Sequence, residues 1–203
     1  MSPTVTIVPT GSANIASVAA ALRRLGTASV LASAADEIRD ASAVVLPGVG
    51  AFGPATQRID DAGWRAALIR RVGDDRPTLA ICLGMQLLFE ASEESPGARG
   101  LGVVPGTVTR LGRGVRVPQL GWNGVSPNGR SRYVDAGWAY FANSYRVEAA
   151  PAGWAVATTE YGGRFVSSIE RGNVLACQFH PELSGPWGST VLRRWLTAAE
   201  EAS

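Results

Sequence analysis

The feature that most constrains the fold of this chain is the alternation, over its first half, of short apolar runs with segments whose apolar residues recur at helical spacing. The runs at residues 5–8, 44–46 and 78–82 are rich in Val, Leu and Ile, which predicts buried strands. The segments at residues 14–25 and 55–72 carry their apolar residues on one helical face, which predicts helices. Repeated strand-helix units favour an α/β fold with a doubly wound, mostly parallel sheet.

The second half has a different texture, because glycine and proline divide it into short β-rich segments from residue 100 onward. We expect these segments to add antiparallel strands to the sheet. Neither an internal repeat nor a linker long enough to mark a boundary is found, so residues 1–203 are expected to form a single domain. The other expected elements are strands at 29–31, 103–111, 138–147, 154–159, 165–170 and 174–179, and helices at 85–91 and 189–199.

Charge and hydropathy exclude several classes of function. The formal net charge is only +2 and the arginines are scattered, so no basic stripe predicts binding to nucleic acid or to an anionic membrane. No apolar run approaches the roughly 20 residues that a membrane span needs. The start of the chain has no charged segment leading into a long apolar one, and two cysteines are too few for a disulfide framework. We therefore expect a cytoplasmic protein with reduced thiols.

The basic residues limit the chemistry further. All nineteen are arginine, which excludes a lysine Schiff base and a phosphate-loop lysine. His180 is the single histidine, so any histidine that acts as a general base must be His180. One histidine and two cysteines provide no metal-ligand cluster, and no dinucleotide fingerprint is present. We expect neither a metal nor a cofactor.

Cys82 stands at the junction between a predicted strand and a predicted helix. In Thr78-Leu-Ala-Ile-Cys82-Leu-Gly84-Met-Gln86 an apolar run leads into the cysteine, and a glycine then opens a helix. This order is typical of a nucleophile elbow, where a sharp turn exposes the side chain and the helix N-terminus favours the thiolate. The alternative is that Cys82 is a small buried residue at a strand end. A second segment favours the catalytic interpretation.

That segment is Gln178-Phe-His180-Pro-Glu182, which ends a predicted strand with a histidine and, two residues later, a carboxylate. In a Cys-His-Glu relay the imidazole takes the thiol proton and later gives it to the leaving amine, while the carboxylate orients the ring. A solitary histidine is more often structural. However, Cys82 and His180 both follow predicted parallel strands, at the edge where open α/β sheets bind ligands. The coincidence predicts a triad of Cys82, His180 and Glu182.

The loop Pro47-Gly48-Val49-Gly50 also follows a predicted strand. Its glycines permit backbone angles that point a peptide N–H at a ligand. The N–H groups of Val49 and Leu83 would then form an oxyanion hole, each donor contributing on the order of 3 to 4 kcal/mol to the reduction of the barrier. Taken alone, a Pro-Gly-x-Gly segment is far more often an ordinary turn than an oxyanion loop.

These segments resemble those of the class I glutamine amidotransferases and, within that class, the glutaminase subunits of imidazole glycerol phosphate synthase, an enzyme of histidine biosynthesis. The resemblance covers nearly the whole chain. The segments that carry it are Pro47-Gly-Val-Gly-Ala-Phe52, Cys82-Leu-Gly-Met-Gln86, Gly121-Trp-Asn123, Tyr140-Phe141 before Ser144-Tyr145, and Gln178-Phe-His-Pro-Glu182 before Ser184-Gly185.

The resemblance implies an amidotransferase α/β fold that hydrolyses L-glutamine to glutamate and ammonia. The implied partner is a (β/α)₈-barrel cyclase subunit in a heterodimer, through which ammonia reaches a phosphoribosyl substrate. By the same resemblance Cys82 is the nucleophile, His180 the acid and base, and Glu182 the orienting carboxylate. The implied glutamine-binding residues are Gly50, Gln86, Ser144 and Tyr145.

Several positions depart from the family pattern. Gln119, Asn143 and Leu183 stand where the family usually carries His, His and Lys. In the family these segments lie near the subunit interface and couple glutaminase activity to the cyclase substrate. Leu183 cannot make a lysine's charged contact, so we expect different coupling contacts or a partner changed to match.

The resemblance assigns three further residues to the partner interface, namely Asn14, Trp122 and Asn123. Without the resemblance, Trp122 and Asn123 would be interpreted as a turn packed under a core aromatic. Cys177 lies inside a predicted strand, where a buried structural thiol is expected.

Two other functions compete with glutamine hydrolysis for imidazole glycerol phosphate synthesis. One is a glutaminase subunit that serves another pathway, such as pyridoxal phosphate or aminobenzoate synthesis, which the Gly-Trp-Asn and Tyr-Phe segments disfavour. The other is a catalytically silent scaffold, which the intact triad disfavours. A peptidase of related fold ranks last, because Gln86 and the glycine loop suit a small pocket better than a peptide groove.

Overall fold

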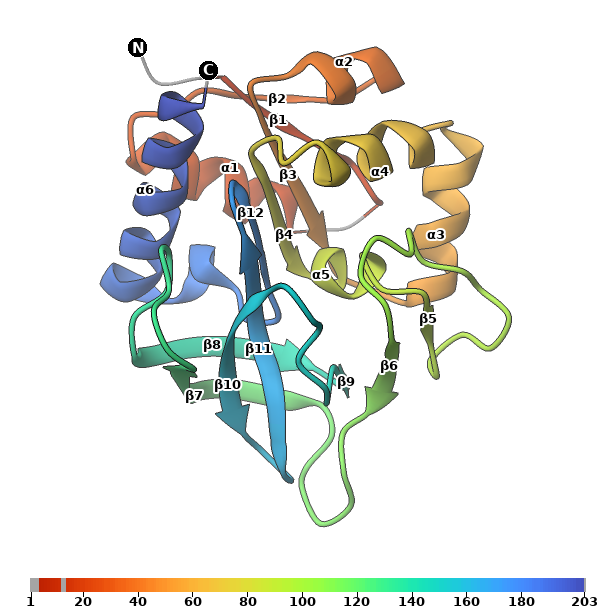
Figure 1. The fold of residues 1–203 in the computed structure, drawn as a ribbon, viewed down its shortest axis with the longest axis vertical. Helices are drawn as coiled ribbons and strands as arrows, with labels where there is room; N and C mark the ends of the chain where they lie inside the picture. The colour runs from red at the N-terminus through yellow and green to blue at the C-terminus, as the bar shows by residue number, and fades with distance from the viewer. Residues whose placement is uncertain (1–3, 12–13, 203) are drawn as a thin grey trace.

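The computed structural model describes residues 4–11 and 14–202 and has a nine-stranded sheet with helices on both faces (Figure 1). The strand order is β2-β1-β3-β4-β12-β11-β10-β7-β8. The first five strands are parallel and the rest are antiparallel, so the expected α/β fold with added antiparallel strands is confirmed. None of the helices in the described ranges is long and apolar enough to cross a membrane.

The parallel half is the buried centre of the molecule. Apart from the exposed edge strand β2, its strands are continuous, largely apolar runs because both faces are covered by helices. The register sets Gly48 opposite Cys82 at the carboxyl ends of two adjacent strands. The parallel strands are β1 (Val5–Ile7), β2 (Ser29–Leu31), β3 (Ala43–Gly48), β4 (Thr78–Cys82) and β12 (Val174–Cys177).

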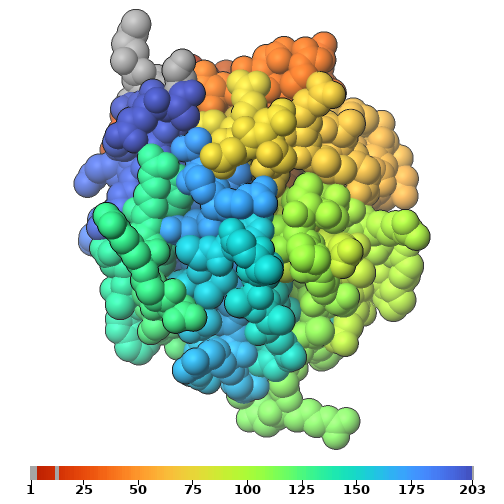
Figure 2. Space-filling model, viewed as in Figure 1, coloured from red at the N-terminus to blue at the C-terminus, as the bar shows by residue number. Residues whose placement is uncertain are grey.

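The antiparallel half extends the sheet beyond β12, and a small three-stranded sheet lies beside it (Figure 1). The loop that joins β6 to β7 projects from this β-rich end (Figure 2). The antiparallel strands are β7 (Gln119–Pro127), β8 (Gly137–Asn143), β10 (Ala155–Glu160) and β11 (Arg164–Arg171), and the small sheet contains β5 (Ala91–Ser92), β6 (Thr107–Arg110) and β9 (Tyr145–Arg146).

The helices divide between the two faces because side chains alternate along each strand. Val44 and Leu46 pack under α2, α3, α4 and α5, whereas Val45 and Ile81 pack under α1 and α6. The helices are α1 (Ile15–Arg24), α2 (Ala35–Asp40), α3 (Phe52–Asp61), α4 (Arg65–Gly73), α5 (Leu83–Leu87) and α6 (Gly185–Glu201), with a 3-10 turn η1 (Pro181–Leu183).

Several element boundaries differ from the sequence prediction. The helix expected at residues 55–72 is two helices, because Gly63 adopts a left-handed φ of +69° between them. The helix expected at 85–91 begins at Leu83 and ends at Leu87. The strand expected at 138–147 is interrupted at Ser144. Helix α2 and strand β7 were not predicted, because the first is short and the second is rich in glycine and polar residues.

Gly84 allows α5 to pack tightly against β3. A Cβ at this position would lie 1.9 Å from the carbonyl oxygen of Leu46. We expect Gly84→Ala to destabilise the fold by about 2 to 4 kcal/mol, because the start of α5 must move away from the sheet. Gly73→Ala is the matched control, since its Cβ would meet no atom within 4 Å. Urea unfolding of both variants tests this, and equal stabilities would contradict the close-packing account.

Candidate active site

Cys82 occupies the sharp turn between β4 and α5. Its backbone has φ of 55° and ψ of −111°, an unusual conformation for a residue other than glycine. Strained backbone of this kind costs of order 1 to 3 kcal/mol and is concentrated at functional sites. This backbone conformation is the sharp turn expected of a nucleophile elbow, but Cys82 is only 6% exposed and opens onto a cavity rather than onto the open surface.

His180 and Glu182 lie side by side where β12 leads into η1. The His180 Nδ1 atom is 2.7 Å from Oε1 of Glu182, and both side chains are buried. Asn14, at the start of α1, donates from Nδ2 to the same carboxylate oxygen over 2.6 Å. Within the described ranges Nε2 of His180 has no hydrogen-bond partner, so the ring is held on its Nδ1 side and open on the other.

Burial lowers the pKa of His180, but the Cys82 sulfur and the Glu182 carboxylate together raise it well above its ordinary value of 6.5. The sulfur acts by its proximity, because no hydrogen bond joins it to Nε2 in this conformation. A protonated imidazole beside a cysteine stabilises the thiolate and provides a proton for a leaving group. The structure therefore brings Cys82, His180 and Glu182 together, and their assignment as a catalytic triad stays a prediction.

The titration of His180 can be followed directly, because it is the single histidine in the chain. We expect its ring signals in an NMR titration to change with a midpoint above pH 6.5, since the raised pKa keeps the ring protonated past its ordinary value. Glu182→Gln should lower that midpoint, because it removes a charge that favours the imidazolium. Glu160→Gln, on the exposed end of β10, should not. A midpoint at or below 6.5 in the unaltered protein would contradict the assigned electrostatics.

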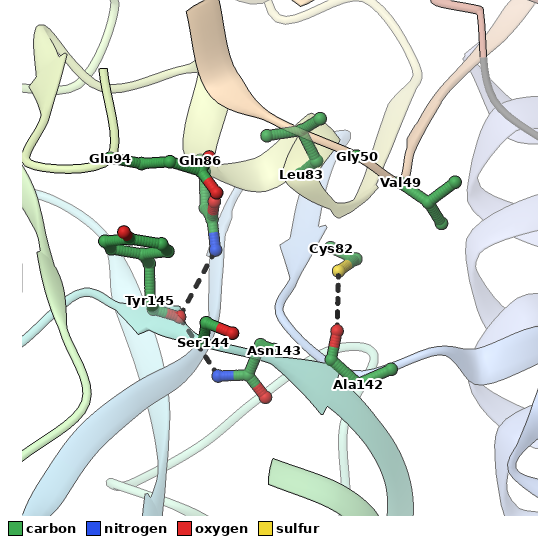
Figure 3. A pocket seen from close by; sticks show the side chains of 10 residues that line it. All are labelled: Val49, Gly50, Cys82, Leu83, Gln86, Glu94, Ala142, Asn143, Ser144 and Tyr145. Atoms are coloured by element: carbon green, nitrogen blue, oxygen red, sulfur yellow. Dashed lines mark hydrogen bonds between the residues drawn. The ribbon is translucent and has the colours of Figure 1, made fainter. Parts of the chain in front are cut away.

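A cavity of about 120 Å³ opens onto the sulfur of Cys82 (Figure 3). All of the glutamine-binding and oxyanion residues suggested by the sequence line it, as does Asn143, which was assigned to the partner interface. Glu94 and Ala142 are lining residues that the sequence did not suggest. In Figure 3 the Cys82 sulfur faces the Ala142 carbonyl oxygen, at 3.9 Å. The lining residues are Val49, Gly50, Cys82, Leu83, Gln86, Glu94, Ala142, Asn143, Ser144 and Tyr145.

Glu94 is the lining residue with a charge, and the sequence reasoning missed it. Its Oε2 accepts a hydrogen bond of 2.7 Å from the backbone N–H of Phe52, at the start of α3. The contact ties the loop after β3 to the segment after β5. The sequence signal that could have found Glu94 is the cluster of acidic residues after the helix that follows Cys82. From the sequence alone, such a cluster is interpreted as a solvent-exposed turn.

The comparisons with known proteins agree with this geometry. The family described as glutamine amidotransferase class-I matches residues 7–199. The chain belongs to this family. Among relatives, imidazole glycerol phosphate synthase subunit HisH of Methanopyrus kandleri is 45% identical over 199 residues, covering 96% of this chain and 98% of that protein. HisH of Symbiobacterium thermophilum is 41% identical, covering 94% and 92%.

A longer relative is imidazole glycerol phosphate synthase hisHF of Arabidopsis thaliana, 43% identical over 95% of this chain. The chain spans only 34% of that protein. Among solved structures, a glutamine amidotransferase superposes with a TM-score of 0.78 at 21% identity, covering 97% of this chain and 99% of that one. PurLQS from Thermotoga maritima gives 0.75 at 16% identity, covering 97% and 99%. These two confirm the amidotransferase fold.

Three of the residues assigned to the partner interface are buried in this amidotransferase. Gln119 and Asn143 face each other across β7 and β8, and they are 3% and 4% exposed. Asn143 also lines the cavity and donates to the Tyr145 carbonyl oxygen over 3.0 Å. Asn14 is buried against the triad carboxylate. Any role of these side chains in coupling to a partner stays a prediction, and it must act through buried contacts.

The other assigned residues lie nearer the surface. Asn123 is half-buried and donates to the Glu160 carbonyl oxygen over 3.0 Å, which fastens β7 to the end of β10. Trp122 is 55% exposed, so it is not a core turn residue. We define the hydrophobic hairpin face as the exposed apolar side chains of β7, β8 and η1, which are Leu120, Trp122, Trp138 and Leu183.

No group of three or more His, Cys, Asp or Glu residues in the described part of the amidotransferase is placed to hold a metal ion. The expectation that the enzyme uses neither a metal nor a cofactor stays a prediction. Cys177, the second cysteine, is fully buried next to the site, and burial raises the pKa of its thiol well above its ordinary value. This thiol is therefore kept protonated and unreactive.

Proposed function

We propose that this chain is the glutaminase subunit of an imidazole glycerol phosphate synthase. It would hydrolyse L-glutamine to glutamate and ammonia at Cys82 and pass the ammonia to a (β/α)₈-barrel cyclase subunit in a heterodimer. The observation that carries the proposal is the elbow cysteine, which opens into a small polar cavity while His180 and Glu182 lie beside it. The HisH relatives support the pathway.

The chemistry follows from the triad. The Cys82 sulfur attacks the side-chain amide carbon of glutamine, and the carbonyl oxygen becomes an oxyanion. His180 gives its proton to the leaving nitrogen, so ammonia departs and a thioester remains. Water, deprotonated by the same imidazole, then splits the thioester to glutamate and restores the thiol. Glu182 holds the ring through Nδ1 and stabilises its charged form.

The cavity suits glutamine in charge and size. We propose that the Glu94 carboxylate binds the α-ammonium group, an assignment that the sequence alone did not suggest. Ser144 and Tyr145 would hold the α-carboxylate through their backbone, and Gly50 and Gln86 would flank the side chain. The N–H groups of Val49 and Leu83 remain the proposed oxyanion hole. The list of proposed substrate contacts is thus Gly50, Gln86, Glu94, Ser144 and Tyr145.

The hydrophobic hairpin face is the proposed docking surface for the cyclase. It contains two tryptophans at 55% and 64% exposure, and large exposed aromatics of this kind are typical of interfaces. It lies next to the site, since Leu120 is paired with Ala142, whose carbonyl oxygen faces the Cys82 sulfur. Ammonia released there would have a short route to the partner.

We also propose that residues 1–203 form a single domain that works in the cytoplasm. One sheet that includes residues from β1 to β12 supports the first statement. Two unpaired cysteines, one of them at the site, suit a reducing compartment.

Glutamate release tests the proposed function. The purified chain is mixed with the cyclase subunit of the same organism, and release from L-glutamine is measured with and without the phosphoribosyl ligand of the cyclase. The proposal expects release that rises strongly when both cyclase and ligand are present. Glutamate release that does not depend on the cyclase would assign the chain to another amidotransferase. If no glutamate is released under any condition, a silent scaffold would be favoured.

The docking surface gives a further prediction. Trp122→Ala should weaken binding to the cyclase about tenfold or more, because a central exposed tryptophan is a common interface hot spot. Leu31→Ala is the matched control: Leu31 is also 55% exposed but lies on β2, at the opposite edge of the sheet. Titration calorimetry measures both affinities. Equal losses, or no loss at Trp122, would remove the hairpin face from the interface.

A further inference from the structure

Gln178 lies directly behind the nucleophile and is completely buried. It follows β12, and its backbone N–H donates to the Ser167 carbonyl oxygen over 2.8 Å, which fixes the start of the side chain. Its Nε2 donates to the Cys82 sulfur over 3.5 Å. Its Oε1 accepts a hydrogen bond of 2.8 Å from Nε2 of Gln86. One amide therefore contacts both the nucleophile and a residue of the cavity wall.

The orientation of this amide is determined by its neighbours. Nε2 of Gln86 also donates to the Tyr145 carbonyl oxygen over 3.3 Å, and a carbonyl oxygen can only accept (Figure 3). The Gln86 nitrogen must therefore face this side, which makes the oxygen of Gln178 its second acceptor. The NH₂ group of Gln178 is left to face the sulfur of Cys82.

We propose that Gln178 is a further functional side chain of the active site, which stabilises the Cys82 thiolate by a hydrogen bond and fixes the orientation of Gln86. The proposal deepens the proposed function and rests on it. A thiolate has no proton to donate, so it gains from an N–H donor placed at a sulfur contact distance. A neutral thiol would instead use the Ala142 carbonyl oxygen, 3.9 Å away, as its acceptor.

The surroundings of the sulfur leave few other donors. The charged and titratable groups around it are His180 and Glu182 from the β12 to η1 segment, Cys177 from β12, and Glu94 across the cavity. The carboxylates repel a thiolate, and the buried thiol of Cys177 lies against the Ala80 carbonyl oxygen. His180 and Gln178 are therefore the side chains that favour the charged sulfur.

The second consequence concerns the substrate. Both protons of the Gln86 amide are engaged, by Gln178 and by Tyr145. Its Oε1 is then the free atom of the amide, available as a hydrogen-bond acceptor at the cavity. Without Gln178, the Gln86 amide could rotate and present a donor instead. Gln178 would therefore affect both the reactivity of the sulfur and the binding of glutamine.

The test is the pH dependence of Cys82 alkylation by iodoacetamide, followed by mass spectrometry of the peptide that contains Cys82. Gln178→Met keeps the length of the side chain and removes both hydrogen bonds. Gln178→Glu keeps the shape of the side chain and an acceptor for Gln86, but it replaces the N–H donor at the sulfur with a carboxylate oxygen. If the Met variant does not fold, the Glu variant provides the test of the hydrogen bond to the sulfur. Ser167→Ala is the matched control, because it removes another buried polar atom next to Gln178 without a contact to the sulfur.

We expect the midpoint of alkylation to move up by about one pH unit in both Gln178 variants, so that the rate at pH 7 falls about tenfold. Ser167→Ala should keep the original profile. A folded Gln178 variant whose midpoint and rate match the unaltered chain overturns the proposal. Because alkylation needs neither glutamine nor the cyclase, this outcome is separate from a failure of the proposed glutaminase activity.

Kinetics of the complex separate the two roles. Gln178→Glu preserves the acceptor for Gln86, so kcat should fall while KM for glutamine stays within about twofold. Gln178→Met frees the Gln86 amide, so KM should rise as well. Equal changes of KM in both variants would remove the orienting role from the proposal.

Discussion

Cys82→Ala in the complete complex is expected to lower glutamate release by at least about 10⁴-fold, because the alanine provides no atom that can form the thioester. The fold should survive, since the side chain is small and the strained turn is built by the packing of α5 against β3 rather than by the sulfur. Binding of glutamine should be nearly unchanged, because the proposed contacts to the α-ammonium and α-carboxylate groups remain. A single-turnover experiment at a saturating concentration of L-glutamine measures the rate of glutamate formation, and so gives the loss of rate in the chemical step alone.

The matched control is Cys177→Ala, which removes the other thiol of the chain. Cys177 is fully buried, and its sulfur lies 3.8 Å from the Ala80 carbonyl oxygen of the neighbouring strand β4. We expect its loss to leave kcat within about threefold and to cost stability of the order of 1 kcal/mol, as for a small deleted core group. If Cys82→Ala kept more than a few per cent of the activity, the nucleophile would have to be another group.

Arg71→Leu is expected to destabilise the fold by about 3 to 5 kcal/mol, because it leaves several buried carbonyl oxygens without donors. The guanidinium is 1% exposed and donates to the carbonyl oxygens of Ile38, Ala41 and Pro77 at 3.0, 2.7 and 2.8 Å. It joins the end of α2 to the loop before β4. Burial lowers the pKa of Arg71 to about 10, with a smaller effect from Arg76, so the side chain is still charged at neutral pH.

Arg70→Leu provides the control for this prediction, since Arg70 is the preceding residue of α4 and is exposed. Its substitution should change the free energy of unfolding by no more than about 0.5 kcal/mol. Arg71→Lys should be intermediate, because an ammonium group has fewer donors and cannot span the three carbonyls. Urea unfolding curves measure all three. A loss at Arg71 no larger than at Arg70 would contradict its role as a buried connection between the two loops.

Most of the parallel half of the fold could be predicted from the sequence, because burial on both faces makes β1, β3, β4 and β12 largely apolar, whereas β2 is a short edge strand. The strands at 29–31 and 78–82 were predicted with their observed bounds. The strand predicted at 44–46 is the middle of β3, which spans Ala43–Gly48. The long β7 was missed because its inward positions include Gln119, Gly121 and Asn123, while its outward positions include the apolar Leu120 and Trp122, so the usual alternation is lost. Strand β7 is held by pairing with β8, the next strand along the chain, and with β10.

That Cys82, His180 and Glu182 lie together could be predicted because Cys82 and His180 follow strands of a parallel sheet, which brings such strand ends to one edge. The supporting contacts could not. Glu94 reaches the cavity from a loop after β5, and Gln178 touches the sulfur only because β4 and β12 are neighbours in the sheet. Asn14 is buried and donates a hydrogen bond to Glu182, a residue near the other end of the sequence. Such contacts are set by three-dimensional packing and leave no local pattern in the sequence.

The most direct test of the central claim is to trap the nucleophile in the complex with a glutamine analogue that carries a diazoketone in place of its side-chain amide. The attack of a cysteine on such a group expels dinitrogen and leaves a stable thioether. We expect mass spectrometry to find the adduct on the peptide with Cys82 and not on that with Cys177, and to find it lost when excess L-glutamine competes. No adduct, an adduct on Cys177, or labelling that L-glutamine does not prevent would contradict the assignment of Cys82 as the residue that attacks glutamine.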